Sequence, residues 1–409
     1  MKPSIIYVTT SRSDYGPSYW VIRELLGDAR IRAGLVVAGS HLSGAHGRTV
    51  AEIERDGFPI LATVPFLLQS DDEQSFGEAC AAAVAGFTKM LVQLRPTIAV
   101  VAGDRIELLP FITAAVLTRT AIAHLSGGDV TEGAIDEQVR HAVTKAAHLH
   151  FPNSALSANR VLQMGEEPWR VRMLGDPATD HFVRGRSSSV DELAEALGFR
   201  PDHNTLIVTF HPSTTEPDHI AGQTEELITA LRAHDGAIVV TAPAPDPGAE
   251  AIRRRLIEFG ASSDRVIFRE NLGSKHYYGL LRIAGAMVGN SSSGLSEAPL
   301  VPLAVVNVGV RQQGRERGAN VIDVPPVASA IEKAVRRALS PEFQRAMTAA
   351  SKNVSREPVS RRIVDALVDL AHDTRLLSKR FVRLEMLSTQ PFENGIGEGQ
   401  VSKQEGESR

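Results

Sequence analysis

The strongest constraint on this chain is a repeated alternation of short β-branched runs with longer amphipathic patterns. Parallel strands need a crossover between them, usually a helix, so this order predicts βαβ units and a parallel sheet covered by helices on both faces. Strands are expected at residues 4–9, 34–38, 60–64, 97–102, 121–125, 149–151, 171–174, 205–210, 237–241, 265–268, 286–288 and 303–306. Helices are expected near residues 17–26, 73–94, 107–118, 132–146, 154–164, 223–234, 248–259, 274–283 and 328–339.

Length and local composition predict how these units are divided. A chain of 409 residues exceeds one ordinary core, and the segment 184–189, RGRSSS, is the best candidate linker. We therefore expect two doubly wound α/β domains, residues 1–183 and 184–357, with the active site in the cleft between them. Residues 358–375 read as a closing helix, and the polar, Gly-rich residues 390–409 as a disordered tail.

Charge and cysteine content exclude several classes of protein. The net charge is −4, which gives no reason to expect nucleic acid or an anionic membrane as a partner. Cys80 is the single cysteine, so no intramolecular disulfide can form, and a reducing compartment is expected. The first apolar run is too short for a signal peptide, and no run approaches the roughly 20 apolar residues of a membrane helix. We expect a cytoplasmic protein.

Ligands of open α/β sheets bind beyond the carboxyl ends of the strands, where this chain carries five polar clusters. In the first, residues 9–16 (TTSRSDYG), Arg12 and several hydroxyls precede a helix and suit a phosphate. An ordinary strand-to-helix turn is the alternative. In the second, Asp104 follows the expected strand 97–102 and is either a helix cap or a carboxylate held by its neighbour Arg105.

The third cluster is acidic. A Gly-Gly pair at 127–128 precedes Asp129, Glu132, Asp136 and Glu137. Paired glycines allow close approach of the backbone to a ligand, and the four acids favour general acid/base chemistry. Carboxylates that only stabilise a helix N-terminus are the alternative.

The fourth cluster is residues 211–214 (HPST). His211 opens this loop after the expected strand 205–210, and either a structural or a ligand-binding role fits it equally well. The fifth is the strongest signal. Its hydroxyls and glycine enter a helix and can seat an anion, and an acid one turn later can accept hydrogen bonds from ribose hydroxyls. A plain Ser-rich loop is the alternative. The residues of the fifth cluster are Ser291, Ser292, Ser293, Gly294 and Glu297.

The sequence lacks a Cys/His metal spacing, a GxSxG elbow and a GxGxxG dinucleotide motif, so neither a metal nor a cofactor is expected. In this order the clusters resemble the hydrolysing UDP-N-acetylglucosamine 2-epimerases of bacterial sialic-acid and related nonulosonic-acid pathways. The resemblance runs from about residue 4 to 325. The matching segments are TTSRSDYG, AGSHLSGAHGRTVAEIERDGF, VAGDRIELLP, HLSGGDVTEGAIDEQVRHAVTKAAHLHF, LGDPATD, FHPST, VGNSSSGLSEAPL and VNVGVRQQGRERGANVIDV.

This resemblance implies two Rossmann-like domains in the glycosyltransferase-B arrangement, with the final helix crossing back to the first domain. It implies a homodimer or homotetramer acting on a UDP-sugar. The implied reaction eliminates UDP to give a 2-acetamidoglucal, then adds water and reprotonates carbon 2 to release N-acetylmannosamine. Asp104, Asp129 and Asp136 become the acid/base candidates, and His211 would bind or protonate the departing diphosphate. The implied UDP-binding residues are Arg12, Arg105, Ser291, Ser292, Ser293, Gly294, Glu297, Arg311 and Arg315.

The chain departs from the family pattern at three places. The family's Gly-Gly-Glu ends in Asp129, one methylene shorter; its GSPG-type turn is GDPA at 175–178; and TAPA stands at 241–244 where a TYPN-like run is expected. These departures concern the identity of the sugar. Three other functions are compatible with the same fold: a glycosyltransferase, a non-hydrolysing UDP-sugar 2-epimerase and a catalytically silent nucleotide-binding protein.

Overall fold

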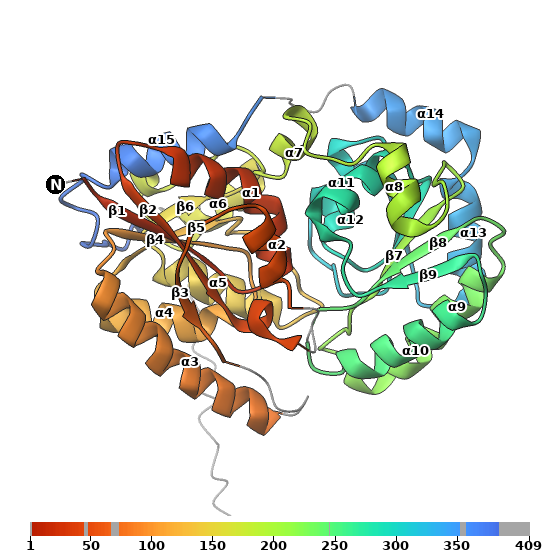
Figure 1. The fold of residues 1–409 in the computed structure, drawn as a ribbon, viewed down its shortest axis with the longest axis horizontal. Helices are drawn as coiled ribbons and strands as arrows, with labels where there is room; N and C mark the ends of the chain where they lie inside the picture. Colours follow the sequence, from red (N-terminus) through yellow and green to blue (C-terminus); the bar gives the residue numbers. More distant parts are fainter. Residues whose placement is uncertain (1, 45–47, 67–72, 245, 352–356, 384–409) are drawn as a thin grey trace, which may run out of the picture.

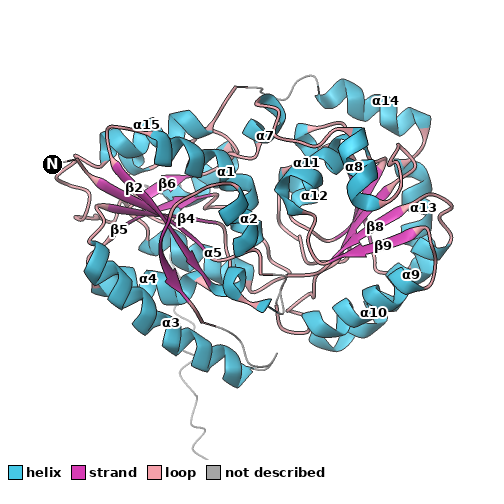
Figure 2. Ribbon diagram, in the orientation of Figure 1, coloured by secondary structure: helices cyan, strands magenta, loops and turns pink. Residues whose placement is uncertain are grey.

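The structure is a computed structural model that describes residues 2–44, 48–66, 73–244, 246–351 and 357–383. Two parallel sheets, each of six strands, lie side by side with helices on both faces (Figures 1 and 2). The predicted tail, residues 390–409, lies outside the described residues. None of the described helices combines the length and the apolar character that crossing a membrane requires.

The first sheet is built from residues before position 152. Its strand order is β3 (Ile60–Val64), β2 (Arg32–Ala38), β1 (Ser4–Thr9), β4 (Ile98–Ala102), β5 (Ala121–Leu125) and β6 (Leu149–Phe151). Successive strand residues point to opposite faces, so Ile5 and Ile6 enter two different buried clusters. This explains the continuous β-branched runs. The associated helices are α1 (Arg12–Gly27), α2 (Val50–Arg55), α3 (Glu73–Leu94), α4 (Leu108–Leu117), α5 (Asp136–Ala146) and α6 (Ala155–Gln163).

The second sheet has the strand order β12 (Val321–Val324), β11 (Ala304–Val308), β10 (Ala286–Gly289), β7 (Leu206–Thr209), β8 (Ile238–Thr241) and β9 (Val266–Arg269). Two short helices, α7 (Thr179–Val183) and α8 (Val190–Leu197), connect it to the first sheet. The other helices of this half are α9 (Ile220–Arg232), α10 (Ala249–Ala261), α11 (Gly273–Ile283), α12 (Ser293–Ser296), α13 (Ala328–Ala338) and α14 (Pro341–Ala350).

Both sheets have the same strand connectivity. In each sheet the first three strands run from a central strand to one edge, and the next three run from the other side of that central strand to the opposite edge. The reversal lies between β1 and β4 in one sheet and between β7 and β10 in the other. Loops diverge at such a reversal, which leaves a crevice beyond the carboxyl ends of the strands. Two crevices are therefore available to form one site.

The last helix, α15 (Ser360–Leu370), returns to the first sheet (Figure 1). Ile363 and Leu367 are buried in the same cluster as the strands of that sheet. Asp180 in α7 accepts hydrogen bonds from the backbone N–H groups of Val359 and Ser360, at 2.6 and 3.1 Å. A carboxylate at these otherwise unpaired donors fixes the start of α15.

The expected strand at 171–174 is wrong. Only Val171 pairs, in an isolated parallel bridge with His150, and the next two residues are exposed, so this segment has no buried face to stabilise a strand. Several elements were not predicted, including the strand β12 and the helices α2, α7 and α14. The edge strand β12 has only four residues and is only half-buried, α2 and α7 have six and five residues, and helix α14 begins at a proline. The two predicted α/β sheets are otherwise confirmed.

Candidate active site between the two sheets

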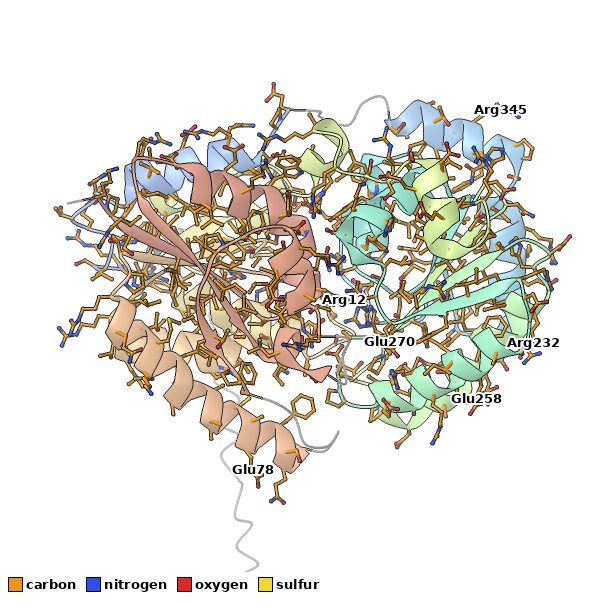
Figure 3. The ribbon with its side chains drawn as sticks, in the orientation of Figure 1. Arg12, Glu78, Arg232, Glu258, Glu270 and Arg345 are labelled. Carbon is orange, nitrogen blue, oxygen red and sulfur yellow. The ribbon has the colours of Figure 1, made fainter. Side chains whose placement is uncertain are left out.

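A cavity of about 280 Å³ lies where the strand-end loops of the two sheets face each other. It is lined by both halves of the chain, and Figure 3 shows Arg12 of the first half close to Glu270 of the second. Asp129 and Gly294, two of the predicted site residues, are not among its lining residues. The predicted residues that do line it are Arg12, Asp104, Arg105, Asp136, His211, Ser291, Ser292, Ser293, Glu297, Arg311 and Arg315.

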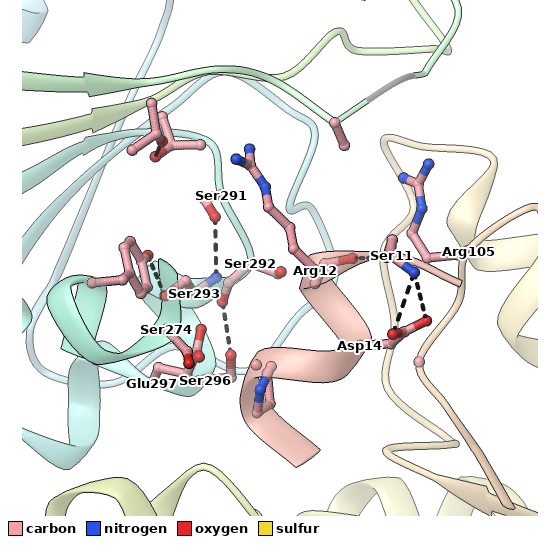
Figure 4. Close-up of a pocket in the computed structure, with 18 of the residues that line it drawn as sticks. Ser11, Arg12, Asp14, Arg105, Ser274, Ser291, Ser292, Ser293, Ser296 and Glu297 are labelled. Carbon is pink, nitrogen blue, oxygen red and sulfur yellow. Dashed lines mark hydrogen bonds between the residues drawn. The ribbon is translucent and has the colours of Figure 1, made fainter. Parts of the chain in front are cut away.

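Arg12 reaches across the interface from the first turn of α1. Its guanidinium donates to the carbonyl oxygen of Ala242 at 2.6 Å and to that of Glu270, both in loops of the second sheet. The turn beneath it is held by Asp14, whose carboxylate accepts from the backbone N–H of Thr10 at 2.9 Å. Burial raises the pKa of Asp14 to about 6. Arg12 therefore joins the two halves at the cavity wall (Figure 4).

Asp104 has a different partner from the one expected. It lies beside Arg105 in sequence, but its carboxylate is hydrogen-bonded by Arg140 of α5, and Arg105 turns towards the second sheet. Arg140 is buried and also donates to the Thr131 hydroxyl at 2.8 Å. The two side chains diverge because each has a better-placed counter-charge elsewhere in the tertiary structure. The arginine from α5 fixes Asp104 at the cavity wall.

Four buried charges form a chain across the interface. Arg105 donates to Asp246 at 2.6 Å, and Arg311 donates to Asp136 at 3.1 Å. The second oxygen of Asp246 lies 3.8 Å from Arg311. Each arginine thus meets a carboxylate from the opposite half of the molecule. Sequence reasoning did not select Asp246, because this residue follows no strand directly and belongs to no recognised motif.

The pKa values of Asp136 and Asp246 are shifted in opposite directions. Burial raises the pKa of Asp136, Arg311 opposes that effect and Asp246 adds to it, and the pKa is raised overall. Burial also works to raise the pKa of Asp246, but Arg105 and Arg311 outweigh it and the pKa is lowered. Two nearby acids with divergent proton affinities are typical of acid/base sites.

Asp129 lies behind the cavity wall. Its carboxylate accepts from Arg315 at 2.9 Å and from the Ser157 hydroxyl, and Arg315 itself lines the cavity. The preceding Gly128 has φ +83°, and a Cβ there would come within 2.2 Å of the Ser157 carbonyl oxygen. The Gly-Gly turn therefore serves close packing on α6, and Asp129 holds an arginine at the site.

His211 is oriented by the backbone. Its Nδ1 accepts a hydrogen bond from the backbone N–H of Ala244 at 2.9 Å, so the neutral ring carries its proton on Nε2. Burial, with Arg311 nearby, holds the pKa of His211 well below its ordinary value. The ring is thus a neutral hydrogen-bond donor, and an anionic ligand would favour its protonation.

The serine turn forms the opposite wall (Figure 4). The Ser291 hydroxyl accepts from the backbone N–H of Ser293 at 3.4 Å, and Tyr277 donates to the Ser293 hydroxyl at 2.6 Å. The helix that follows, α12, is a single turn, so its dipole is small and the hydroxyls and N–H groups matter more. Gly294 lies behind this turn, where a Cβ would come within 2.8 Å of Val305.

Glu297 is buried one turn beyond the serines and accepts a hydrogen bond from the Tyr278 hydroxyl. Burial raises its pKa. The Tyr278 ring stacks on His181 of α7, with centroids 3.9 Å apart. The two tyrosines were not predicted as site residues because they lie within a helical pattern, α11, rather than after a strand. Within the described ranges, no group of three or more His, Cys, Asp and Glu side chains is placed to hold a metal ion.

Comparison with known proteins identifies relatives along most of the chain. Residues 23–368 match the family described as UDP-N-acetylglucosamine 2-epimerase. A Legionella pneumophila UDP-N,N'-diacetylbacillosamine 2-epimerase (hydrolyzing) is 35% identical, with 83% of this chain and 90% of that protein covered. A Campylobacter jejuni GDP/UDP-N,N'-diacetylbacillosamine 2-epimerase (hydrolyzing) is 32% identical, with 79% and 84% covered.

Solved structures show the same fold. The UDP-GlcNAc 2-epimerase of Neisseria meningitidis bound to UDP-GlcNAc aligns with a TM-score of 0.73 at 17% identity, covering 90% of this chain and all of that one. A putative UDP-N-acetylglucosamine 2-epimerase of Listeria monocytogenes aligns with a TM-score of 0.74 at 14% identity, covering 94% of this chain and all of that one. The two Rossmann-like sheets are thus in the glycosyltransferase-B arrangement. With the family match spanning most of its length, this chain belongs to the UDP-N-acetylglucosamine 2-epimerase family.

Proposed function

We propose that this protein is a hydrolysing 2-epimerase, which converts a UDP-linked 2-acetamido sugar into UDP and the free sugar inverted at carbon 2. The observation that carries the proposal is the shared cavity. Asp104 and Asp136 of the first half line it together with His211 and the serine turn of the second half. A reaction that moves a proton and releases a diphosphate needs these two sets of groups within one substrate's length.

In this proposal residues 1–183 supply the proton-transfer groups and residues 184–357 hold the nucleotide. A carboxylate removes the proton from carbon 2 as the bond from carbon 1 to the UDP oxygen breaks, which leaves a 2-acetamidoglucal. Asp104 and Asp136 suit proton transfer, because the bound guanidiniums of Arg140 and Arg311 orient their carboxyl groups. Water then adds at carbon 1, and carbon 2 is protonated on the other face.

The nucleotide has matching groups on the opposite wall. The hydroxyls of Ser291, Ser292 and Ser293 and the guanidinium of Arg315 suit the diphosphate, and Glu297 suits the ribose hydroxyls. His211 can donate from Nε2 to the departing phosphate oxygen. Asp129 is assigned to the positioning of Arg315, since that arginine separates it from the cavity.

The hydrolysing form is favoured by relatives. Both proteins at 35% and 32% identity are named as hydrolyzing. The first is named for UDP-N,N'-diacetylbacillosamine and the second for GDP/UDP-N,N'-diacetylbacillosamine. A Neisseria meningitidis relative at 28% identity is named for UDP-N-acetylglucosamine. The chemistry at carbons 1 and 2 is common to both sugars, so the proposed mechanism holds for either substrate.

The test is incubation of the full chain with each of these UDP-sugars in heavy water, with products resolved by NMR. UDP together with a free sugar that is inverted and deuterated at carbon 2 supports the proposal. A deuterated UDP-sugar epimer without free UDP would identify a non-hydrolysing epimerase instead. Release of UDP only when an acceptor sugar is added would identify a glycosyltransferase. If neither substrate changes, the result would identify a catalytically silent nucleotide-binding protein.

A further inference from the structure

A further acidic group lines the cavity and has no role in the mechanism above. It is Asp176, in the loop that precedes α7. Its Oδ1 accepts a hydrogen bond from the backbone N–H of Ala178 at 2.8 Å. Its Oδ2 accepts from the side-chain amide of Asn153 at 3.2 Å, and the Ser126 hydroxyl donates to the other end of that amide at 3.2 Å. Ser126, Asn153 and Asp176 thus form a hydrogen-bonded row, and all three line the cavity.

The row begins at a strained position. Ser126 has φ +60°, a left-handed conformation that residues with a side chain seldom adopt. Its backbone N–H donates to the carbonyl oxygen of Phe151 at the end of β6, so the sheet holds it in place. Strain of this kind persists where the surroundings fix it and is concentrated at functional sites.

The surroundings of Asp176 differ from those of Asp104 and Asp136, the two acids assigned to proton transfer above. Asp104 is bound by Arg140 and Asp136 by Arg311, and a guanidinium favours the charged form of a carboxyl. In the described part of the chain, no lysine, arginine or histidine forms an ion pair with Asp176. Its hydrogen-bond donors are neutral amides.

The charged groups around Asp176 come from both halves. Glu297 of the second half and Asp129 of the first repel its charged form, while Arg315 attracts it more weakly. Burial is the largest influence, and the pKa of Asp176 is raised to about 7. At neutral pH this carboxyl therefore carries a proton for a substantial part of the time, in contact with the substrate cavity.

We propose that Asp176 is the proton donor to carbon 2 of the sugar in the second half of the reaction, an inference that rests on the proposed function. The double bond between carbons 1 and 2 of the glucal supplies the electron pair for the new C–H bond. The proton leaves the Asp176 carboxyl, which becomes a carboxylate. Carbon 1 becomes electron-poor and takes the oxygen of water, whose extra proton passes to an ionised carboxylate such as Asp104.

The division of labour follows from the two environments. In this assignment the arginine-bound Asp104 accepts a proton, and Asp176, which is bound only by neutral amides, donates one. Removal and return of a proton at one carbon on opposite faces needs two groups of different proton affinity, and this cavity provides them. The three carboxyls Asp104, Asp136 and Asp176 all come from the first half, while the diphosphate groups come from the second.

The deciding experiment is Asp176→Asn, with UDP-N-acetylglucosamine as the probe and UDP, 2-acetamidoglucal and free epimer measured separately over time. The variant should release UDP within a few-fold of the wild-type rate but form the epimer about 100-fold more slowly, so that the glucal accumulates. Asp176→Glu should restore part of the epimer formation. Asp191→Asn, the same change at an exposed ion pair with Arg200, should behave as the wild type.

Several outcomes would overturn the inference. Equal amounts of UDP and epimer at wild-type rates from Asp176→Asn would show that another group protonates carbon 2. Loss of UDP release together with epimer, while UDP still binds, would place Asp176 in the elimination step instead. Failure of the wild-type protein to release UDP from either substrate would refute the proposed function, which is a separate result.

A measurement on the wild-type protein tests the inference without any variant. The yield of epimer per UDP released should fall as pH rises through and above about 7, because Asp176 then loses its proton before it can donate it. The 2-acetamidoglucal should accumulate in proportion. A yield that stays constant from about pH 6 to about pH 9 would contradict the role of Asp176.

Discussion

The two halves of this molecule have the same strand order and opposite chemistry. Each sheet reverses direction beside its first strand and opens a crevice there. The first half fills its crevice with carboxyls, among them Asp104, Asp136 and Asp176, while the second fills its crevice with the serine turn and His211. The scaffold therefore decides where a ligand binds, and the loops decide what is done to it. The comparison also predicts that substitutions in the two halves impair different steps: turnover in the first half and UDP binding in the second.

The largest effect is expected in the acidic half. Asp136→Asn should lower turnover by roughly 100-fold to 10,000-fold, since it removes a proton-transfer group, and should leave UDP affinity nearly unchanged. UDP release assays and calorimetric titration with UDP measure the two quantities. Asp365→Asn, at an exposed position on α15, is the control. A parallel loss of UDP affinity would show that the first half also holds the nucleotide.

The next effect concerns the contact between the halves. Asp246→Asn removes a buried charge between Arg105 and Arg311, and should lower the free energy of unfolding by about 3 kcal/mol. It should also lower the pKa of Asp136, because a repelling charge is lost and Arg311 is freed for that carboxyl. Chemical denaturation and the acid limb of the pH–rate profile test the two statements.

The control for this prediction is the exposed ion pair of Asp191 with Arg200. Asp191→Asn should change the free energy of unfolding by less than about 1 kcal/mol, because solvent screens the pair. Equal effects of the two substitutions would mean that the chain of charges across the interface does not hold the halves together.

A smaller effect is expected in the nucleotide half. Glu297→Ala removes a buried acceptor beside the serine turn and should weaken UDP binding by about tenfold, equivalent to one hydrogen bond to a charged group. Turnover at saturating substrate should change little. Titration with UDP alone gives the affinity, and Glu258→Ala on the exposed face of α10 serves as the reference. A fall in turnover without a change in UDP affinity would remove the distinction between the halves.

The smallest effect concerns the stability of the free protein. The pKa of Asp176 is raised to about 7, so the folded state holds this proton more tightly than the unfolded chain, and the free energy of unfolding falls as pH rises towards 7. Asp176→Asn should abolish that fall, so that the variant gains stability relative to the wild type between pH 5 and pH 8. Denaturation curves at pH 5 and pH 8 measure it. A pH dependence identical to the wild type would show that Asp176 is not perturbed.

Particular residues show how far the sequence could predict the site. Strand ends are local features, so Arg12, Asp104, His211 and the serine turn could be found from the alternation of runs alone. Asp246, Tyr278 and Asp176 could not be selected this way. Asp246 lies in a loop without a signature, and Tyr278 lies within a helical pattern. Asp176 lies in the turn 175–178, which the sequence marks only as a departure from the family pattern. Their roles arise from contacts with residues far away in the chain.

The sequence by itself determined the two α/β sheets, because hydrophobic periodicity is a property of neighbouring residues. Only the tertiary structure decided which charges meet. It bound Asp104 to Arg140 rather than to the adjacent Arg105, placed Asp129 behind Arg315, and set Asp246 between two arginines. Counter-charges are chosen by distance and burial in the folded molecule, and neither quantity is encoded in a short stretch of chain.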